Sequence, residues 1–397
     1  MIPRLVQETI EQSLQEFSAV MVIGPRAAGK STCCQAALPN DSHRFQMDLP
    51  LDRAKAEVDP EAFFAPGSSP LLLDEVQAWP ESFKWVKNFI DQDRSIKGRY
   101  LLTGSQQFQL LKEASDSLVG RMALVTLFPL SWAELAAIGA LPMIPTLADT
   151  LALALRGGYP ELWAFPSLSR NRWMEAYLNL YLERDVGLLH GIQQMGRFRT
   201  FLGVLAPRAA QVLNVASIAR ECGVPESTIR DWLSILERSM LIRLLQPYSA
   251  NFSKRWVKAP KLIFCDTGLL CYLLGIDTVA TLERSPMWGH IFENLVIMEA
   301  IKLRSFEESR CHMFYLRIDE SNEIDLLIQR GTQLIGYEIK SRATVTPKDA
   351  SSLERLSQVV PLTDRVVLSL HPDSTSLTSK SRCMPWSQGT AALDQPT

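Results

Sequence analysis

Nine residues near the start of the chain have the types and spacing of a loop that binds nucleotide phosphates. Two glycines separated by four residues are followed by a lysine and a hydroxyl residue, in the segment Gly24, Pro25, Arg26, Ala27, Ala28, Gly29, Lys30, Ser31 and Thr32. Glycines let the backbone N–H groups of such a loop converge on phosphate oxygens, because no Cβ stands in the way. We therefore expect this segment to bind ATP.

Two side chains of this loop have separate expected roles. Lys30 would contact the β- and γ-phosphates as a point charge, and the Ser31 hydroxyl would bind Mg2+. An apolar run over residues 19–23 precedes the loop, and a helix-compatible run over 31–38 follows it. This order predicts a strand, a phosphate loop and a helix.

Two adjacent carboxylates, Asp74 and Glu75, end a second apolar run that starts at Pro70. Such a run is typical of a buried parallel strand, whose carboxyl end opens onto the site of an α/β sheet. Asp74 would hold Mg2+ through water, and Glu75 would polarise the attacking water. The pair predicts that the bound ATP is hydrolysed.

A third apolar run, over residues 99–104, also ends in polar side chains. Thr103, Ser105 and Gln106 are candidates for sensing the γ-phosphate or orienting the water, although a plain turn after a strand would have the same sequence. Arg121 could stabilise the charge of the transferring phosphoryl group. It could equally be a surface arginine, and the sequence leaves both interpretations open.

Length and composition indicate a globular protein with two or three domains. The chain has 397 residues, 47% hydrophobic residues and a net charge of -2, which gives no strongly basic field over the whole chain. Its seven cysteines include no C-x-x-C pair, so neither a disulfide framework nor a zinc site is expected. We find no signal-peptide pattern and no membrane-span pattern, and we expect a cytoplasmic location.

The middle of the chain has the proportions of a helix-turn-helix. Residues 215–222 and 226–236 have helical patterns, and Gly223 to Pro225 would form the turn. From Arg197 to Lys258 there are ten basic residues against four acidic ones. This basic excess is expected of a module that binds DNA, with Ser227, Thr228 and Arg230 starting the second helix. A lid that contacts protein is the alternative.

The last third of the chain has the layout of a metal-dependent phosphodiesterase. Glu293 lies in a helical pattern, Asp325 in a strand pattern, and Glu338 and Lys340 project from one face of a further strand. Asp325 and Glu338, with Glu293, would hold Mg2+ or Mn2+, while Lys340 would stabilise charge or help to activate water. The pattern indicates the fold more strongly than it indicates cleavage.

Taken together, these motifs resemble those of a family of bacterial and archaeal AAA-type ATPases. Its members carry a C-terminal domain of unknown function with a restriction-endonuclease-like core. The resemblance runs from about Arg4 to about Leu370. Besides the phosphate loop and the acidic strand, it rests on the segments 102–105, 120–121, 129–131, 157–161, 181–185 and 258–269 and on those around Glu293, Asp325, Glu338 and Lys340.

The resemblance implies ATP binding, a winged-helix middle and a nuclease-like third domain whose activity and substrate are generally unassigned. Pro25 and Arg26 replace the looser glycines of many phosphate loops, but the required positions are intact. Arg121 acting as an arginine finger depends on which subunit it faces.

The expected fold class is α/β, with an N-terminal parallel sheet covered by helices on both faces, a helical and winged-helix middle, and a restriction-endonuclease-like end. The expected domains are residues 1–165, 166–285 and 286–370. A tail over 371–397, rich in Ser, Thr and Pro, is expected to be disordered.

Three functions fit these features. The first is a Mg-dependent ATPase that acts on or near DNA. The second is a signalling or toxin–antitoxin-like switch, in which nucleotide controls contacts with a protein partner and the nuclease-like domain is inactive. The third is a nuclease licensed by ATP. An oligomer is compatible with each of them.

Overall fold

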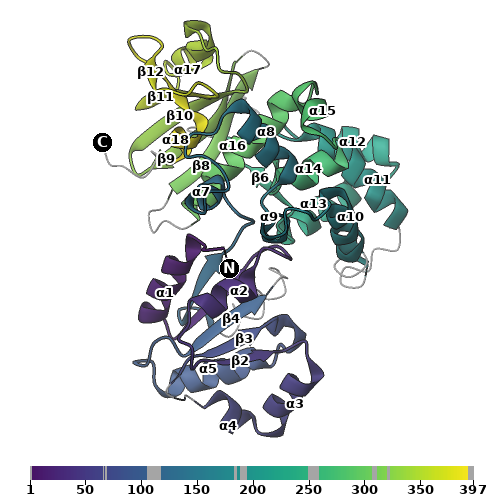
Figure 1. The fold of residues 1–397 in the computed structure, drawn as a ribbon, viewed down its shortest axis with the longest axis vertical. Helices are drawn as coiled ribbons and strands as arrows, with labels where there is room; N and C mark the ends of the chain where they lie inside the picture. Colours follow the sequence, from purple (N-terminus) through teal and green to yellow (C-terminus); the bar gives the residue numbers. More distant parts are fainter. Residues whose placement is uncertain are drawn as a thin grey trace. The chain divides into compact units, whose positions relative to one another are not determined.

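The computed structural model describes residues 2–65, 67, 69–104, 118–182, 186–187, 195–248, 259–305, 311–319 and 322–391. The chain forms two compact units, whose elements are labelled in Figure 1. The first unit comprises Met1–Leu130, Tyr159–Glu161 and Arg238–Met240. The second comprises Ser131–Gly158, Leu162–Glu237 and Leu241–Thr397.

A five-stranded sheet forms the centre of the first unit. Its strands are β1 (Ala19–Ile23), β2 (His43–Gln46), β3 (Leu71–Asp74), β4 (Tyr100–Gly104) and β5 (Met122–Thr126). The order across the sheet is β2-β3-β4-β1-β5, and every neighbouring pair is parallel. The parallel sheet expected from the sequence is thus confirmed.

Helices cover both faces of this sheet, as expected. They are α1 (Val6–Glu16), α2 (Lys30–Ala36), α3 (Pro50–Val58), α4 (Pro60–Phe64) and α5 (Ser82–Gln92), with a 3-10 turn, η1, at Val76–Ala78. Met21 and Ile23 of β1 share a core cluster with Phe83 and Val86 of α5. Helices α1 and α2 also contact β1, but their buried side chains lie outside that cluster, on the other face.

The second unit begins with helices and a short antiparallel strand pair. The helices are α7 (Trp132–Ala137), α8 (Leu147–Arg156), α9 (Pro160–Ala164), α10 (Arg170–Tyr181), α11 (Met195–Leu205), α12 (Val215–Cys222), α13 (Glu226–Arg238), α14 (Thr267–Leu273) and α15 (Val279–Glu283), with a 3-10 turn, η3, at Ala206–Arg208. Strands β6 (Ile242–Leu245) and β7 (Lys261–Phe264) pair antiparallel. Helix α12 ends where Gly223 adopts a left-handed conformation with φ 64°, so the predicted turn lies where the sequence placed it.

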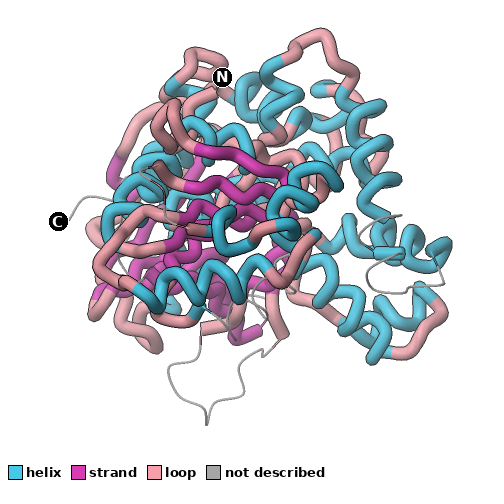
Figure 2. The backbone as a smooth tube through the Cα atoms, turned by 90° about the horizontal axis from the view of Figure 1, so that it is seen from below, coloured by secondary structure: helices cyan, strands magenta, loops and turns pink. Residues whose placement is uncertain are grey.

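A six-stranded mixed sheet completes the second unit. Its elements are α16 (Trp288–Arg304), β8 (Cys311–Asp319), β9 (Asn322–Arg330), β10 (Gln333–Lys340), η4 (Pro347–Ala350), α17 (Ser351–Leu356), β11 (Asp364–Ser369), β12 (Thr375–Ser376), β13 (Arg382–Pro385) and α18 (Trp386–Ala391). The strand order is β12-β13-β11-β10-β9-β8. Figure 2 draws strands in magenta and helices in cyan. Helix α16 contacts β10 of this sheet as well as β7 and α14, which joins the sheet to the preceding helices.

The division into units differs from the three predicted domains. The first unit's continuous part ends at Leu130, whereas the sequence predicted a boundary at 165. Residues on either side of the predicted boundary at 285 belong to one unit, because α16 packs on β7 and because Tyr248 bonds through its backbone to Tyr315 of β8. Among the described helices, none is long and apolar enough to cross a membrane.

The prediction that 371–397 is disordered is wrong as far as Ala391. This segment contributes β12, β13 and α18, and only residues 392–397 lie outside the described part of the chain. The reason is Trp386, which is 1% exposed and packs its ring against Trp132 at 5.7 Å and Phe292 at 6.4 Å. The polar composition of the segment concealed one large apolar side chain that completes a core.

We predict that Trp386→Ala lowers the free energy of unfolding by roughly 3–5 kcal/mol, because it removes a large buried aromatic side chain. Urea denaturation followed by circular dichroism measures the loss. Ser374→Ala, at an exposed position in the same segment, is the matched control and should change the free energy by less than about 0.5 kcal/mol. Equal stabilities of the two variants would mean that this segment is not part of the core.

Candidate functional site

The phosphate loop connects β1 to α2, and its backbone conformation requires glycine at two positions for different reasons. Gly29 has φ 89°, in the left-handed region that favours glycine. A Cβ on Gly24 would lie 2.1 Å from the carbonyl oxygen of Leu127, so any larger residue would displace the backbone beside it. Ala27 also has a positive φ, 59°. The loop conformation is therefore fixed by close packing as well as by glycine freedom.

Arg4 stabilises this loop through hydrogen bonds to backbone carbonyl oxygens. Its guanidinium donates hydrogen bonds to the carbonyl oxygens of Ala28, at 2.7 Å, and Phe128, at 2.6 Å. The side chain is buried, so these charge-assisted bonds form away from water, where they are strong. Arg4 was not among the predicted site residues, because its partners lie 24 and 124 positions away in the sequence.

Lys30 is buried and folded onto its own loop. Its ammonium group donates to the carbonyl oxygens of Gly24, at 3.1 Å, and Pro25, at 3.0 Å. Burial lowers the pKa of Lys30, and the carboxylates of Glu75 and Asp74 oppose this shift. The positive charge expected to meet the phosphates thus lies inside the predicted loop.

Asp74 is 1% exposed and lies where Ser31 can reach it. The Ser31 hydroxyl donates to Asp74 Oδ1 at 2.9 Å, and the Thr103 hydroxyl donates to the same oxygen. Arg44 of β2 forms an ion pair with Oδ2 at 3.1 Å. The structure therefore brings together Ser31 and Asp74, the two residues predicted to bind Mg2+, and adds Arg44, which the sequence analysis missed.

Glu75 follows β3 in a left-handed conformation, with φ 51°. This conformation is uncommon for a residue other than glycine and turns the chain sharply after Asp74. The backbone N–H of Glu75 donates to the Thr103 hydroxyl at 3.2 Å, and its carboxylate accepts from the Gln77 amide. Thr103 thus contacts both acidic residues, which fits its place among the candidates for orienting water.

The other predicted residues of this site have different outcomes. Ser105 and Gln106 lie outside the described residues. Arg121 donates to both carboxylate oxygens of Asp91, at 2.7 and 2.9 Å. It precedes β5, at the end of the parallel sheet opposite to the phosphate loop. The role of Arg121 as an arginine finger stays a prediction. From this position, Arg121 would have to act on nucleotide bound by a neighbouring subunit.

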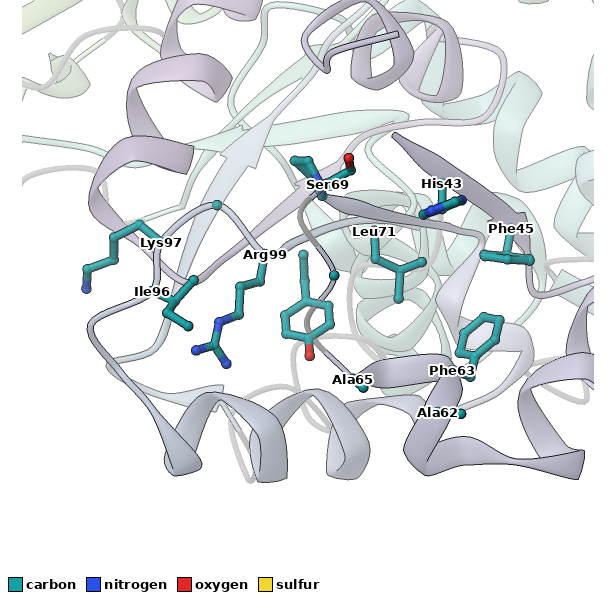
Figure 3. Close-up of a pocket in the computed structure, with 14 residues that line it drawn as sticks. His43, Phe45, Ala62, Phe63, Ala65, Ser69, Leu71, Ile96, Lys97 and Arg99 are labelled. Atoms are coloured by element: carbon teal, nitrogen blue, oxygen red, sulfur yellow. The ribbon is translucent and has the colours of Figure 1, made fainter. Parts of the chain in front are cut away.

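A cavity of about 430 Å³ lies at the amino ends of β2, β3 and β4, and not beside the phosphate loop. Figure 3 shows its lining, with the rings of Phe45 and Phe63 on one side and Ile96, Lys97 and Arg99 on the other. The Arg99 guanidinium donates to two backbone carbonyls, of Phe89 and Asp93, at 2.8 and 2.7 Å. The charge of Arg99 is thus paired with backbone carbonyl oxygens. Since the cavity lies at the end of the sheet opposite to the phosphate loop, it is not part of the nucleotide site.

A second cluster of ionisable groups lies in the second unit. Among the described residues, Glu293, Glu323 and Asp325 have carboxylate oxygens that lie within 4.8 Å of one another. Lys261 of β7 lies among them, with its ammonium nitrogen 2.6 Å from Glu293, 2.6 Å from Glu323 and 3.8 Å from Asp325. The side chain of Lys261 is fully buried. The three carboxylates raise the pKa of Lys261 against the opposing effect of burial, so the lysine stays charged.

Glu338 and Lys340 occupy the neighbouring strand, β10, and bond to each other at 2.6 Å. The second carboxylate oxygen of Glu338 is buried and has no hydrogen-bond partner among the residues that the structure describes. Burial and the nearby Asp325 raise the pKa of Glu338 to about 8. Asp325 accepts a hydrogen bond from the backbone N–H of Ile339 at 2.8 Å. Glu338 is not one of the three grouped carboxylates, and its role as a metal ligand stays a prediction.

Sequence reasoning missed Glu323 and the role of Lys261. Glu323 could have been found, because it lies two positions before Asp325 and so shares its face of β9. Lys261 opens an apolar strand within a segment that supported the family resemblance, but nothing local indicates its partners. Glu293 lies 32 positions further along the sequence, and Glu323 and Asp325 lie further still.

Family models match three consecutive parts of the chain. The model described as "AAA domain" matches residues 16–136, and models described as domains of unknown function match residues 148–280 (DUF8612) and 288–388 (DUF4143). The chain is 30% identical over 337 residues to the uncharacterized proteins Rv2008c of Mycobacterium tuberculosis and Mb2031c of Mycobacterium bovis. Each match covers 84% of this chain and 73% of the relative.

Two solved structures match parts of the chain. The Walker-type ATPase PABY2304 of Pyrococcus abyssi is 15% identical, with a TM-score of 0.46, over 69% of this chain and 96% of its own. A variant of RuvB from Thermotoga maritima is 16% identical, with a TM-score of 0.31, over 60% of this chain and 88% of its own.

We predict that Glu338→Gln flattens the pH dependence of stability. The pKa of Glu338 is raised from 4.5 to about 8 in the folded protein. Between these values the folded chain keeps a proton that the unfolded chain has released, so the stabilisation present below pH 4.5 is lost as the pH rises through 8. The wild type should therefore lose stability between about pH 5 and about pH 8.5, by on the order of 1–3 kcal/mol more than the variant.

Urea denaturation at a series of pH values measures this difference. Glu283→Gln, at an exposed position of the same unit, should reproduce the wild-type curve. Parallel curves for the wild type and Glu338→Gln would contradict the prediction.

Proposed function

We propose that this chain, which belongs to the family of AAA-domain proteins with a C-terminal DUF4143 domain, hydrolyses ATP with the help of Mg2+. The observation that supports this most strongly is the contact of 2.9 Å between the Ser31 hydroxyl and the Asp74 carboxylate. Hydroxyl and carboxylate oxygens suit Mg2+, and these two follow the carboxyl ends of parallel strands of one sheet. The residues present therefore fit the metal.

The same residues suggest what the chain does when nucleotide binds. Lys30 would exchange the carbonyl oxygens of Gly24 and Pro25 for phosphate oxygens, which accept more strongly from an ammonium group because they are charged. Mg2+, when bound, would neutralise part of the phosphate charge. Ser31 and Asp74 would hold it, and Arg44 would have to share or release Asp74 Oδ2.

Glu75 is proposed to polarise the attacking water. Its backbone N–H bonds to Thr103, and Thr103 also bonds to Asp74, so the acidic pair has one common support. Glu75 is only partly buried, which leaves its carboxylate accessible to solvent. This combination of a fixed backbone and an accessible carboxylate suits a general base.

We predict different outcomes for two substitutions in this site. Lys30→Ala should abolish ATP hydrolysis and weaken nucleotide binding by about tenfold or more, because it removes a charge that contacts the phosphates. Glu75→Gln should still bind nucleotide but lower kcat about 100-fold or more, because only water activation is lost. Binding of a fluorescent ATP analogue and phosphate release measure the two effects.

Lys84→Ala is the control for these variants, since Lys84 is an exposed lysine of the same unit and should behave as the wild type. Unchanged turnover in Lys30→Ala would reject the proposed ATPase site. Normal turnover in Glu75→Gln would move the task of water activation to another residue.

We also propose that ATP hydrolysis is coupled to DNA binding through α12 and α13. The specific observation is the pair of helices joined by a tight turn at Gly223, with Arg220 and Arg230 on exposed positions. Arg230 also forms an ion pair with Glu226, but both side chains are largely exposed, so a phosphate could replace the glutamate. Basic positions Lys254, Arg255 and Lys258 lie outside the described residues. The competing function is a nucleotide-controlled switch that binds protein.

We predict that this segment retains duplex DNA in a salt-dependent way. Arg220→Ala combined with Arg230→Ala should weaken binding to all DNA sequences and reduce the slope of log affinity against log salt by about 2. Fluorescence anisotropy between about 50 and about 200 mM salt measures the slope, with Lys84→Ala as the control. Absence of any DNA binding at the lower salt concentration would favour the protein-binding switch.

A further inference from the structure

The carboxylates of the second unit already have a positive partner in the chain itself. We propose that Lys261 is the resident cation of the cluster formed by Glu293, Glu323 and Asp325, and that it excludes a divalent metal ion from this cluster. The second unit then does not cleave phosphodiester bonds with these residues. This inference concerns a site separate from the proposed ATPase site.

The first support is the position of the ammonium group. Lys261 Nζ lies 2.6 Å from an oxygen of Glu293 and 2.6 Å from an oxygen of Glu323, distances typical of strong charge-assisted hydrogen bonds. A divalent metal bound by these carboxylates would need oxygen distances of about 2.0–2.6 Å. It would have to enter the space that the ammonium group occupies. Lysine and metal are therefore alternatives.

The second support is the burial of Lys261 within the described part of the chain. Its side chain is completely buried, and its backbone pairs with Leu245 of β6 and bridges to Val212. Its ammonium group also lies 5.4 Å from the centre of the Tyr315 ring. A lysine that was meant to swing aside for a metal would be expected to have a route to solvent.

The third support is the distribution of charge around the cluster. Glu323 has a second cation, Arg317, at 3.5 Å, and Glu338 is paired with Lys340 at 2.6 Å. Asp325 has, besides Lys261, the backbone N–H of Ile339. Each of these carboxylates thus has at least one donor from the chain. Buried carboxylates must be paired or protonated, and the chain's own donors provide the pairing for Glu293, Glu323 and Asp325.

The presence of an ammonium group in place of a metal ion has a chemical consequence. Metal-assisted phosphodiester cleavage needs a cation that can contact the scissile phosphate and activate water. An ammonium group in the place of a metal ion offers no coordination position for a phosphate oxygen or a water molecule. Glu293, Asp325, Glu338 and Lys340 then have a structural task, which is to hold α16, β7, β9 and β10 together.

Manganese binding to the full-length, nucleotide-free protein tests this proposal. Mn2+ is titrated into the wild type and four variants, Glu323→Gln, Lys261→Met, Lys261→Arg and Lys261→Met with Glu323→Gln, and bound Mn2+ is counted by electron paramagnetic resonance. All proteins share an unaltered phosphate loop, so any weak binding there is common to them. Lys261→Met keeps an unbranched side chain of nearly the same length and removes the ammonium group with its charge and its hydrogen-bond donors.

We expect the wild type, Glu323→Gln and Lys261→Arg to bind equal amounts of Mn2+. Lys261→Met should gain one additional Mn2+ per chain, and adding Glu323→Gln should weaken that new site by about tenfold or more, because one carboxylate ligand is lost. The midpoint of thermal unfolding of Lys261→Met should rise with Mn2+ concentration, because a ligand that binds only the folded state stabilises it. The midpoint of the wild type should not.

Two results would overturn the proposal. One is a Mn2+ site in the wild type that Glu323→Gln removes, and this result does not depend on the folding of any Lys261 variant. The other is a folded Lys261→Met protein that gains no Mn2+ site. Cleavage of plasmid DNA by the wild type, abolished by Asp325→Ala, would overturn the consequence drawn for catalysis.

Discussion

A carboxylate that is removed from water must be matched by a positive charge or by hydrogen-bond donors, and both ionisable sites of this chain are arranged around that requirement. Asp74 is 1% exposed and is surrounded by Ser31, Thr103 and Arg44. The cluster in the second unit surrounds Lys261 instead. The difference lies in the escape route, because the Arg44 side chain is 34% exposed whereas Lys261 is completely enclosed. This difference underlies the proposed exchange of partners at Asp74 and the proposed exclusion of a metal ion by Lys261.

The nucleotide site could be predicted from the sequence because its chemistry is local. The site includes Gly24, Gly29, Lys30 and Ser31, which lie within eight consecutive residues, and the acidic pair comes at the end of a recognisable strand. The helix-turn-helix followed from helix periodicity in the same way. Arg4, Arg44 and Lys261 could not be predicted, because each acts on partners that only the folded chain brings near. A lysine or an arginine in an apolar run has no pattern that distinguishes a surface charge from the centre of a buried cluster.

The C-terminal segment also could not be predicted from local sequence features. Composition suggested a disordered end, since serine, threonine and proline are common there. What decides order is whether a segment buries enough apolar surface to offset its loss of conformational freedom. Trp386 does so through Trp132 and Phe292. The burial of one large apolar side chain therefore decided the order of the segment, in spite of its mostly polar composition.

The position of Trp386 also bears on how the chain is made. One core cluster of the first unit draws its residues from Ala19 to Leu118, and the continuous part of that unit ends at Leu130. The second unit begins at Ser131, but Trp386 bonds to Thr150 across 236 positions of sequence. Domains generally fold in order from the N-terminus during synthesis. The nucleotide-binding unit can therefore begin to fold on the ribosome before its neighbour, whose core includes Trp386.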